Sequence, residues 1–255
     1  MPLQVAPFLR LVHAGFVLAR EGVFGLAVLP DLPPSARFAI SVARLVERRG
    51  VKRTDAAARL TQALNRLGPS YVKLGQFLAT RADVVGADAA AGLAKLQDEV
   101  PPISDDAARA AVVEGLGRSL DEAFIEFGPS VAAASIAQVH RATVLDTDGG
   151  VRDVAVKVLR PGVAGRFARD LESFYLAARL VERFAPQARR LRPVAIVDTL
   201  ARSVHLEMDL RLEAAALSEM AENCAEDPGA RVPSVDWLRP ATLTSTTPQL
   251  PPTPR

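Results

Sequence analysis

VAAASIAQVHRATVLDTDGGVRDVAVKVLR, residues 131 to 160, is the stretch around which the rest of this 255-residue chain is organised. A run of small residues from Val131 to Ser135 leads into a segment rich in β-branched residues, Ile136 to Leu145. The turn-forming residues Asp146 to Gly150 then lead into a second strand that ends at Leu159. Turn residues between two such strands predict a β-hairpin.

Lys157 lies inside the second predicted strand, where side chains alternate between the two faces of the sheet. Val154, Val156 and Val158 share one face, and Lys157 shares the other face with apolar neighbours. A partly buried ammonium needs anionic partners such as a carboxylate or phosphates. The residues leave two interpretations open: a lysine that reaches solvent from an edge strand, or one that binds phosphate. The run Val-Ala-Val-Lys that ends at Lys157 resembles the third-strand lysine motif of protein kinases, in which the lysine holds nucleotide phosphates.

The loop before this hairpin contains Ala132, Ala133, Ala134 and Ser135, where kinases have a glycine-rich loop. Small side chains let backbone N–H groups approach phosphates, but alanine gives up the positive φ that glycine allows. We therefore expect a tighter and stiffer loop than that of kinases.

Composition and charge exclude several classes of protein. A chain of 255 residues can bury one large core or two small ones. Its net charge is only +2, which gives no reason to expect a nucleic-acid partner, although residues 1 to 54 are basic, with seven Arg and one Lys against three acidic residues. A single cysteine, Cys224, rules out an internal disulfide and is typical of a reducing compartment. We therefore expect a cytoplasmic location.

Residues 5 to 23 place apolar side chains at helical spacing, but charged residues keep any run short of the roughly 18 residues that a membrane-spanning helix needs. Two interpretations remain open. The helix lies on a bilayer surface with Arg10 and Arg20 toward the headgroups, or it packs on the rest of the domain. A basic cluster from Arg44 to Arg53 is either a solvated face or a second attraction to anionic lipid.

The stretch from Leu67 to Pro102 predicts a helix in which Lys73 and Gln76 lie opposite an apolar face that includes Tyr71 and Leu74. Spacing alone makes Lys73 and Gln76 part of an exposed polar face.

A long helical run from Pro193 to Asn223 carries Glu207, Asp209 and Glu213. Asp209 and Glu213 share one face of an ideal helix, whereas Glu207 is rotated about 120° from Glu213. Spacing alone predicts a solvated acidic face here.

Together these segments resemble the UbiB family of atypical, protein-kinase-like proteins, also called AarF-domain or ADCK kinases. The hallmark of that family is a Lys-x-Gly-Gln motif, which is present here as Lys73-Leu74-Gly75-Gln76. The longer pattern around it includes Leu67-Gly68-Pro69, Thr80-Arg81, Leu96-Gln97-Asp98 and Val100-Pro101-Pro102. The resemblance continues through Ala132 to Ala142 and Val154 to Gly162, and it covers most of residues 40 to 237.

The resemblance implies catalytic motif positions that spacing does not predict. Lys73 and Gln76 would face the active site from a helical extension that covers the nucleotide pocket. Glu207 and Asp209 match the Glu-x-Asp motif of the family and would lie near Lys73.

The resemblance also implies a nucleotide site in which the alanine-rich loop replaces the kinase phosphate loop and Lys157 pairs with Glu213. The implied nucleotide-binding residues are Val131, Ala132, Ala133, Ala134, Ser135, Ile136, Ala137, Gln138, Val139, Lys157 and Glu213. The implied cofactors are ATP or ADP with Mg²⁺, and we assign no metal ligand in the chain.

The expected fold is α+β. Residues 1 to 115 would form the helical extension with the Lys-x-Gly-Gln motif, packed on an atypical protein-kinase-like N-lobe from residue 116 to 239. The residues of a kinase C-lobe are missing, including the catalytic-loop aspartate and the metal-binding residues. Residues 240 to 255 hold five Pro and five Thr, so we expect a disordered tail. The abrupt change in composition indicates a frameshift or a truncation.

By resemblance, the expected function is that of an atypical kinase or ATPase that supports the biosynthesis of ubiquinone, a polyprenyl-phenol product. The expected partners are an adenine nucleotide, a membrane surface or prenyl lipid, and ubiquinone-biosynthesis proteins, with a peripheral location at the inner membrane. The alternative is a catalytically inactive fragment that binds nucleotide or lipid, because the catalytic and metal-binding residues of the C-lobe are missing.

Overall fold

The computed structural model describes residues 5–25, 41–48, 56–96, 101–146, 148–227, 229–237 and 243–246. The chain divides into two compact units, each made from two separate segments. The helical unit comprises Met1–Asp98 and Ala164–Arg202, and the sheet unit comprises Glu99–Val163 and Ser203–Arg255.

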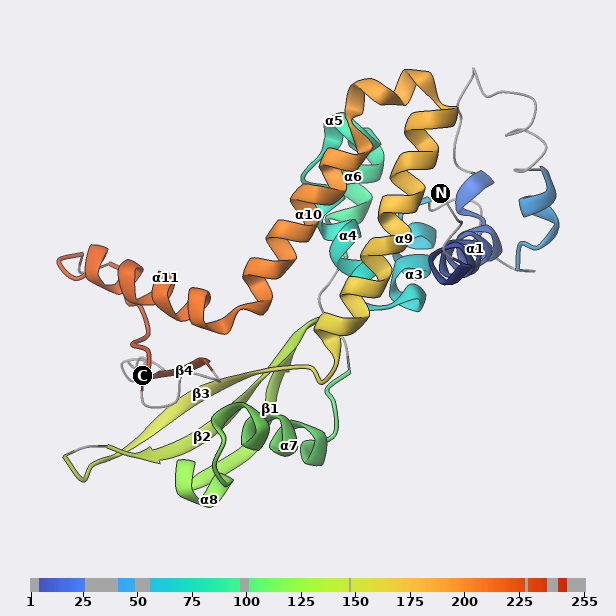
Figure 1. The fold of residues 1–255 in the computed structure, drawn as a ribbon. Coiled ribbons are helices and arrows are strands. Elements are labelled where there is room, and N and C mark those ends of the chain that lie inside the picture. Colours follow the sequence, from blue (N-terminus) through green and yellow to red (C-terminus); the bar gives the residue numbers. More distant parts are fainter. Residues whose placement is uncertain are drawn as a thin grey trace, which may run out of the picture. The chain divides into compact units, whose positions relative to one another are not determined.

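Helices make up the described part of the helical unit (Figure 1). In chain order they are α1 (Val5–Arg20), η1 (Val23–Gly25), α3 (Ala56–Leu67), α4 (Pro69–Ala79), α5 (Ala82–Val85), α6 (Ala87–Leu93), α9 (Val163–Phe184), η2 (Pro186–Leu191) and the first part of α10 (Pro193–Met208). In the part of the chain that the structure describes, no helix is both long enough and apolar enough to cross a bilayer.

Gly75 allows α4 to pack closely against its neighbours. A Cβ atom at this position would lie 2.6 Å from Cδ1 of Leu64, on α3, and 2.5 Å from Cδ1 of Leu96. Both leucine side chains are buried, so neither has room to move away. The glycine of the Lys-x-Gly-Gln motif is therefore required by packing inside the helical unit.

Helix α9 holds both α4 and α1. The ring of Tyr71 on α4 meets the ring of Phe174 on α9 edge to face, with 4.9 Å between centroids. Arg10 on α1 donates to Glu172 Oε2 at 2.6 Å and to Ser173 Oγ at 3.2 Å. The first helix is therefore packed on its unit along this face, as one of the two interpretations expected.

Glu21 is a buried carboxylate at the end of α1, with a side chain only 1% exposed. Its Oε1 atom lies 2.8 Å from Nη1 of Arg66, an ion pair that lacks hydrogen-bond geometry. Arg59, also buried, donates to the backbone oxygens of Glu21, at 2.9 Å, and of Gly22. Arginine side chains from α3 thus stabilise the buried charge and hold the end of α1 in place.

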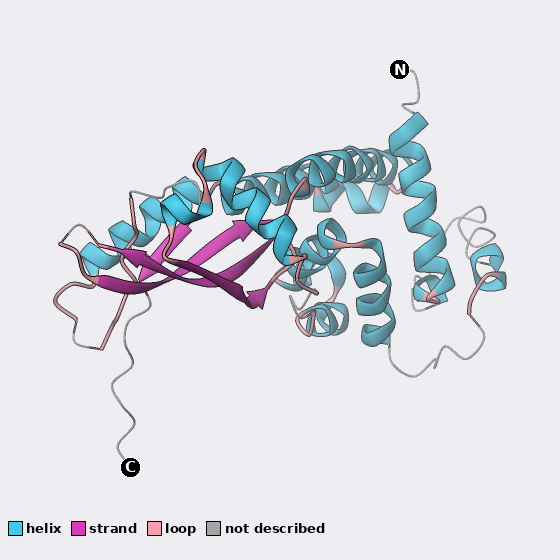
Figure 2. Cartoon of the chain, turned by 90° about the horizontal axis from the view of Figure 1, so that it is seen from below, coloured by secondary structure: helices cyan, strands magenta, loops and turns pink. Residues whose placement is uncertain are grey.

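The sheet unit is a four-stranded antiparallel sheet in the order β1-β2-β3-β4, with its strands drawn in magenta in Figure 2. Its elements are α7 (Asp105–Leu116), α8 (Leu120–Ala123), β1 (Glu126–Ala133), β2 (Ala137–Leu145), β3 (Val151–Leu159), the last residues of α10, α11 (Leu210–Asn223) and β4 (Leu243–Thr246). The predicted hairpin is confirmed as β2 and β3, which pair from Ala137 with Leu159 to Leu145 with Val151.

The alternation of side chains on β3 sets the core of this unit. Val154, Val156 and Val158 are buried, and α7 and α8 cover them with Val112 and Ala123. The valines of β3 thus face this cluster, and Lys157 lies on the opposite face of the strand, as period-two alternation predicts.

The compact units differ from the predicted domains in two places. The predicted boundary near residue 115 cuts through α7, which belongs with the sheet because its Val112 is fully buried in the sheet core. The segment from Ala164 to Arg202 belongs to the helical unit instead of the predicted N-lobe.

The predicted loop and the predicted tail also need correction. Val131 to Ala133 belong to β1, because Ala132 and Ala133 pair with Val139 and Gln138 on β2. The expectation of a disordered tail is wrong for Leu243–Thr246, which pairs with Val154 to Lys157 as β4. Its threonines suit a strand, and the open edge of β3 supplies backbone partners. Residues 238–242 and 247–255 lie outside the described residues.

Tyr71 should report the packing of α4 by its ionisation. Burial raises the pKa of Tyr71 to about 12, with a smaller contribution from Asp170 that Arg10 opposes. The chain has two tyrosines, so in a Tyr175→Phe variant the phenolate absorbance follows Tyr71 alone. We expect one transition near pH 12, which should move toward the ordinary value of about 10 in denaturant.

The neutral phenol stabilises the fold fully below the ordinary pKa of 10, and this contribution should be lost as pH rises from 10 toward 12. A native transition near pH 10 would show that Tyr71 is not packed as described.

Candidate functional site

Lys157 and Glu213 form an ion pair inside the sheet unit. Nζ of Lys157 lies 2.7 Å from each carboxylate oxygen of Glu213. The two side chains are 23% and 36% exposed, so the contact is partly shielded from water. This pairing, which the family resemblance implied, is present, with Lys157 near the C-terminal end of β3 and Glu213 in the first turn of α11.

A helix break at Asp209 brings Glu213 to this position. The long helix expected from Pro193 to Asn223 is wrong, because α10 ends at Met208 and α11 begins at Leu210 (Figure 1). Oδ1 of Asp209 accepts from the backbone N–H groups of Arg211, at 3.0 Å, and Leu212, at 3.3 Å. An aspartate accepting from the first turn is an N-cap, which explains why the second helix starts there.

The alanine-rich turn between β1 and β2 consists of Ala134, Ser135 and Ile136. Ala134 closes it by donating its N–H to the carbonyl of Ala137 at 2.8 Å. Ala137, the first residue after the turn, pairs with Leu159, and Val139 pairs with Lys157. The turn and the lysine therefore lie at the same end of the hairpin.

Arg160 holds this turn from the neighbouring strand. Its backbone N–H donates to the carbonyl of Ile136 and its Nε to the carbonyl of Ala134, both at 2.9 Å. Its Nη2 donates to the carbonyl of Pro101, also at 2.9 Å. Sequence reasoning missed Arg160, although its place directly after the strand of Lys157 and across the hairpin from the turn was a usable signal.

A buried chain of hydrogen bonds stabilises the strand that follows the turn. The backbone N–H of Ile103 donates to Oε1 of Gln138 at 2.9 Å, which fixes the orientation of the amide. Nε2 of Gln138 therefore donates to Nε2 of His140 at 2.7 Å, and Nδ1 of His140 donates to the carbonyl of Gly128 at 2.9 Å. These four residues form a relay from the segment before α7, across β2, to β1.

The relay corrects the expected role of Gln138. Its side chain is 1% exposed and is committed to Ile103 and His140, so it does not face a ligand. The side chains of Ile136 and Ala137 are also buried, in a small cluster with Val163. These three residues are 1 to 3% exposed as whole residues, so the structure does not present them to a nucleotide, contrary to what the resemblance implies.

The catalytic motif residues are divided between the two units. Lys73 and Gln76 lie on α4 and are half-buried, which corrects the exposed polar face that spacing predicts. Glu207, near the end of α10, and Asp209 are half-buried in the sheet unit. The proximity of Lys73 to Glu207 and Asp209 stays a prediction. Among the described residues, no group of three or more His, Cys, Asp or Glu side chains is placed to hold a metal ion.

The chain is similar to known proteins along most of its length. Residues 95–246 match the family model of the ABC1 atypical kinase-like domain. The "Probable protein kinase UbiB" of Marinobacter nauticus is 37% identical over 231 residues, which is 89% of this chain and 41% of that protein. The protein of the same name from Azotobacter vinelandii is 42% identical over 190 residues, 73% of this chain and 35% of that protein.

The "Probable protein kinase UbiB" of Pseudomonas aeruginosa is 37% identical over 247 residues, 94% of this chain and 45% of that protein. The chain therefore spans less than half the length of these curated relatives. A solved complex of Rv3197 with erythromycin from Mycobacterium tuberculosis is 26% identical over 85% of this chain and 51% of that one, with a TM-score of 0.43.

The Lys157–Glu213 pair should show energetic coupling in a double-mutant cycle. Because the pair is partly shielded, we expect Lys157→Met and Glu213→Gln to be coupled by about 1 kcal/mol or more in the free energy of unfolding. The matched control is the exposed pair Arg141–Asp153, whose side chains are 70% and 49% exposed. We expect Arg141→Met and Asp153→Asn to be coupled by only about 0.3 kcal/mol. Additive effects at Lys157 and Glu213 would contradict the pairing.

Removing Gln138 from the relay should be costly. In Gln138→Met the N–H of Ile103 and Nε2 of His140 lose their buried partner, so urea unfolding should show a loss of about 1 to 3 kcal/mol. Arg141→Met, at an exposed position of the same strand, should change stability by less than about 0.5 kcal/mol. Equal effects of the two substitutions would exclude a stabilising relay.

Proposed function

Since the chain belongs to the ABC1 family of atypical kinase-like proteins, we propose that its sheet unit binds an adenine nucleotide, ATP or ADP with Mg²⁺. The bound nucleotide would be the substrate of an atypical kinase or ATPase activity of the UbiB type. One observation carries the proposal: the bidentate Lys157–Glu213 pair lies at the same end of the hairpin as the tight turn of Ala134, Ser135 and Ile136.

The pair prepares the lysine for phosphate. A lysine ammonium has three N–H donors, and the contact with Glu213 directs two of them while holding the side chain in one place. In protein kinases a strand lysine and a helix glutamate must be paired in this way before phosphoryl transfer. The cap at Asp209 supports the same function, because it sets where α11 begins and so where Glu213 lies.

The turn is suited to a phosphate group in two respects. Ser135 and Ile136 are buried, but Ala134 is half-buried, and its small side chain allows backbone groups at that position to approach a ligand closely. Arg160 binds the carbonyls of Ala134 and Ile136, and its positive charge beside the turn favours an anion. Arg160 is therefore a positioning residue in this proposal, since it acts through the turn.

Mg²⁺ would arrive with the nucleotide. Magnesium in such sites is held largely by phosphates and water, with one or two carboxylates. Glu207 and Asp209 precede Glu213 in the chain, and we propose them as the groups that would support the ion.

The family resemblance of the Lys-x-Gly-Gln and alanine-rich motifs supports a further proposal, that the process served is ubiquinone biosynthesis together with other proteins of that pathway. The competing proposal is that this chain binds nucleotide without turning it over. The two differ in one measurable property, the release of phosphate from ATP.

The test is nucleotide binding followed by turnover. Titration of the chain with a fluorescent ATP analogue and Mg²⁺ should give saturable binding, weakened about tenfold or more in Lys157→Met, which corresponds to about 1.4 kcal/mol. Arg141→Met should bind like the parent chain. If the parent does not bind, or if Lys157→Met binds equally well, the proposed site is wrong.

Phosphate release from MgATP, measured with and without membranes, then separates the two proposals. Release that is lost in Lys157→Ala supports the kinase or ATPase. Saturable binding without release supports a chain that binds nucleotide and lacks activity.

A further inference from the structure

Helix α1 presents an apolar face that is exposed in the described part of the helical unit. Pro7, Arg10 and Ala14 follow helical spacing and face the unit, where Arg10 binds Glu172. The opposite face joins apolar residues of the helical segment that begins at residue 41. We call the combined set the α1 surface: Val5, Phe8, Leu9, Val12, Phe16, Val42, Leu45 and Val46, each between 40% and 83% exposed.

A contiguous apolar area of this kind marks a site of interaction with another apolar body. Single exposed hydrophobic residues are ordinary, but these eight come from two segments that are joined in space. The backbone N–H of Arg48 donates to the carbonyl of Arg20 at 2.9 Å, and the guanidinium of Arg48 lies 3.6 Å from buried Glu21. The two segments thus form one surface.

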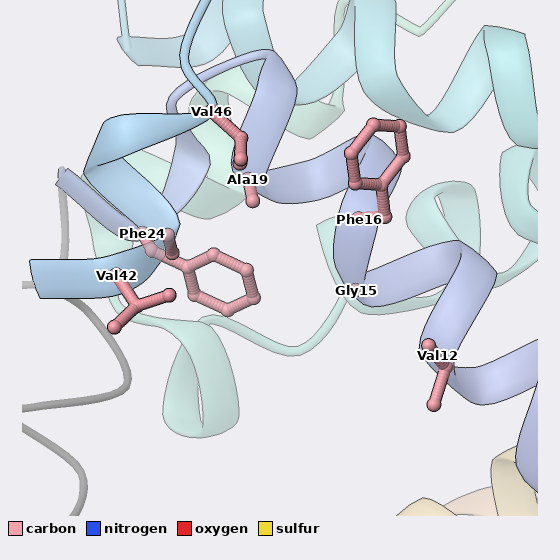
Figure 3. Close-up of a pocket in the computed structure, with 8 residues that line it drawn as sticks. Val12, Gly15, Phe16, Ala19, Phe24, Val42 and Val46 are labelled. Atoms are coloured by element: carbon pink, nitrogen blue, oxygen red, sulfur yellow. The ribbon is translucent and has the colours of Figure 1, made fainter.

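The α1 surface contains a pocket of about 400 Å³ (Figure 3). Phe24 and Val42 lie on one side of it, and Phe16 and Val12 lie along α1 on the other. Every residue that lines it is apolar: Val12, Gly15, Phe16, Ala19, Phe24, Val42, Ala43 and Val46. Its size is within the range of small-molecule sites, about 300 to 1,000 Å³, but the described residues that line it offer no polar side chain to orient a polar ligand. A hydrocarbon chain is the ligand that matches such a lining.

The charges around the α1 surface indicate which kind of molecule would supply the hydrocarbon chain. Helix α1 carries no acidic residue, and Arg20 and Arg44 are exposed at its edge. Within residues 5–25 and 41–48 the only carboxylates are Glu21, which is buried against Arg66, and Glu47. The surface is therefore apolar in the middle and basic at the edge.

A bilayer with anionic headgroups has the complementary arrangement, an apolar interior beneath a negative surface. A second copy of this chain would instead bring two basic edges together, which disfavours self-association through this surface. Helix α1 has 16 residues, fewer than the roughly 20 that a spanning helix needs, so it would lie in the plane of the interface.

We propose that the α1 surface docks on an anionic membrane and that its pocket takes one hydrocarbon chain of a membrane lipid. Phe8, Leu9 and Phe16 enter the acyl region, while Arg20 and Arg44 contact the headgroups. This proposal does not rest on the nucleotide site, because all of its residues belong to the helical unit.

Vesicle flotation with the full chain tests the docking. The chain should float with vesicles of phosphatidylcholine and phosphatidylglycerol and much less with phosphatidylcholine alone. Phe8→Ser and Phe16→Ser should each weaken binding about tenfold, because each removes a large apolar side chain from the acyl region. Arg44→Gln should weaken binding to anionic vesicles about fivefold and leave binding to neutral vesicles unchanged.

The matched control is Phe184→Ser, at the end of α9, where a phenylalanine of the same unit is 67% exposed, more than Phe8 or Phe16, and lies outside the α1 surface. This variant should float like the parent. Failure of the parent to bind anionic vesicles would overturn the proposal, as would equal losses in Phe184→Ser and Phe8→Ser. A parent dimer that Phe8→Ser separates would also overturn it, because a second copy would then cover the surface.

Gly15→Leu tests the pocket separately from the surface. Gly15 lines the pocket, and a Cβ atom there meets nothing within 4 Å, so we expect the leucine side chain to extend into the pocket and reduce its volume. Binding of the fluorescent fatty acid cis-parinaric acid should fall about tenfold, whereas flotation with anionic vesicles should be kept because the surface stays apolar. Unchanged binding of the fatty acid in Gly15→Leu would exclude the pocket as its site. Nucleotide binding of all these variants should match the parent, so failure of the nucleotide site and failure of the membrane site would be distinguishable.

Discussion

The register between β2 and β3 is the constraint on which the sheet unit depends. Antiparallel pairing of Ala137 with Leu159 places Val154, Val156 and Val158 in the core and Lys157 on the other face. A slip of one residue would reverse every side chain on β3, burying the lysine among valines and exposing the core. The hydrophobic core and the orientation of the candidate phosphate-binding lysine are thus consequences of one pairing, and neither can change without the other.

Two sets of side-chain hydrogen bonds, made by Arg160 and Asp209, connect this register to the rest of the site. Arg160 continues β3 and binds the turn that precedes β2, so the turn is held to the strand that carries Lys157. Asp209 ends one helix and starts the next, which places Glu213 over the lysine. Both residues make local hydrogen bonds, and these bonds position groups further along the chain because each sets where a turn or a helix begins.

The helical unit combines two surface chemistries on one helix. Along one face α1 is held by Arg10 and by the buried charge of Glu21, and along the other it leaves large apolar side chains in water. Buried ion pairs add little net stability, since desolvation offsets much of their attraction, but they define orientation well. We therefore interpret the arginines around Glu21 as the groups that fix which face of α1 points outward. Because that orientation is fixed, the apolar face of α1 is available to a partner.

The sequence by itself determined the elements whose signal is local. Alternating valines specified the hairpin and the inward and outward faces of β3, and the motif resemblance identified the family and the pairing of Lys157 with Glu213, 56 positions away. What only the tertiary structure decided depends on partners with no local signal. The sequence predicted Gln138 to be a ligand-binding residue, but in the structure its amide accepts from the backbone of Ile103, 35 residues away. The sequence predicted Leu243–Thr246 to be disordered, but in the structure this segment pairs with the open edge of β3. The physical reason is the same in both cases: a polar group or a short strand has several possible partners in the chain, and folding chooses among them by distance in space, which spacing along the sequence does not encode.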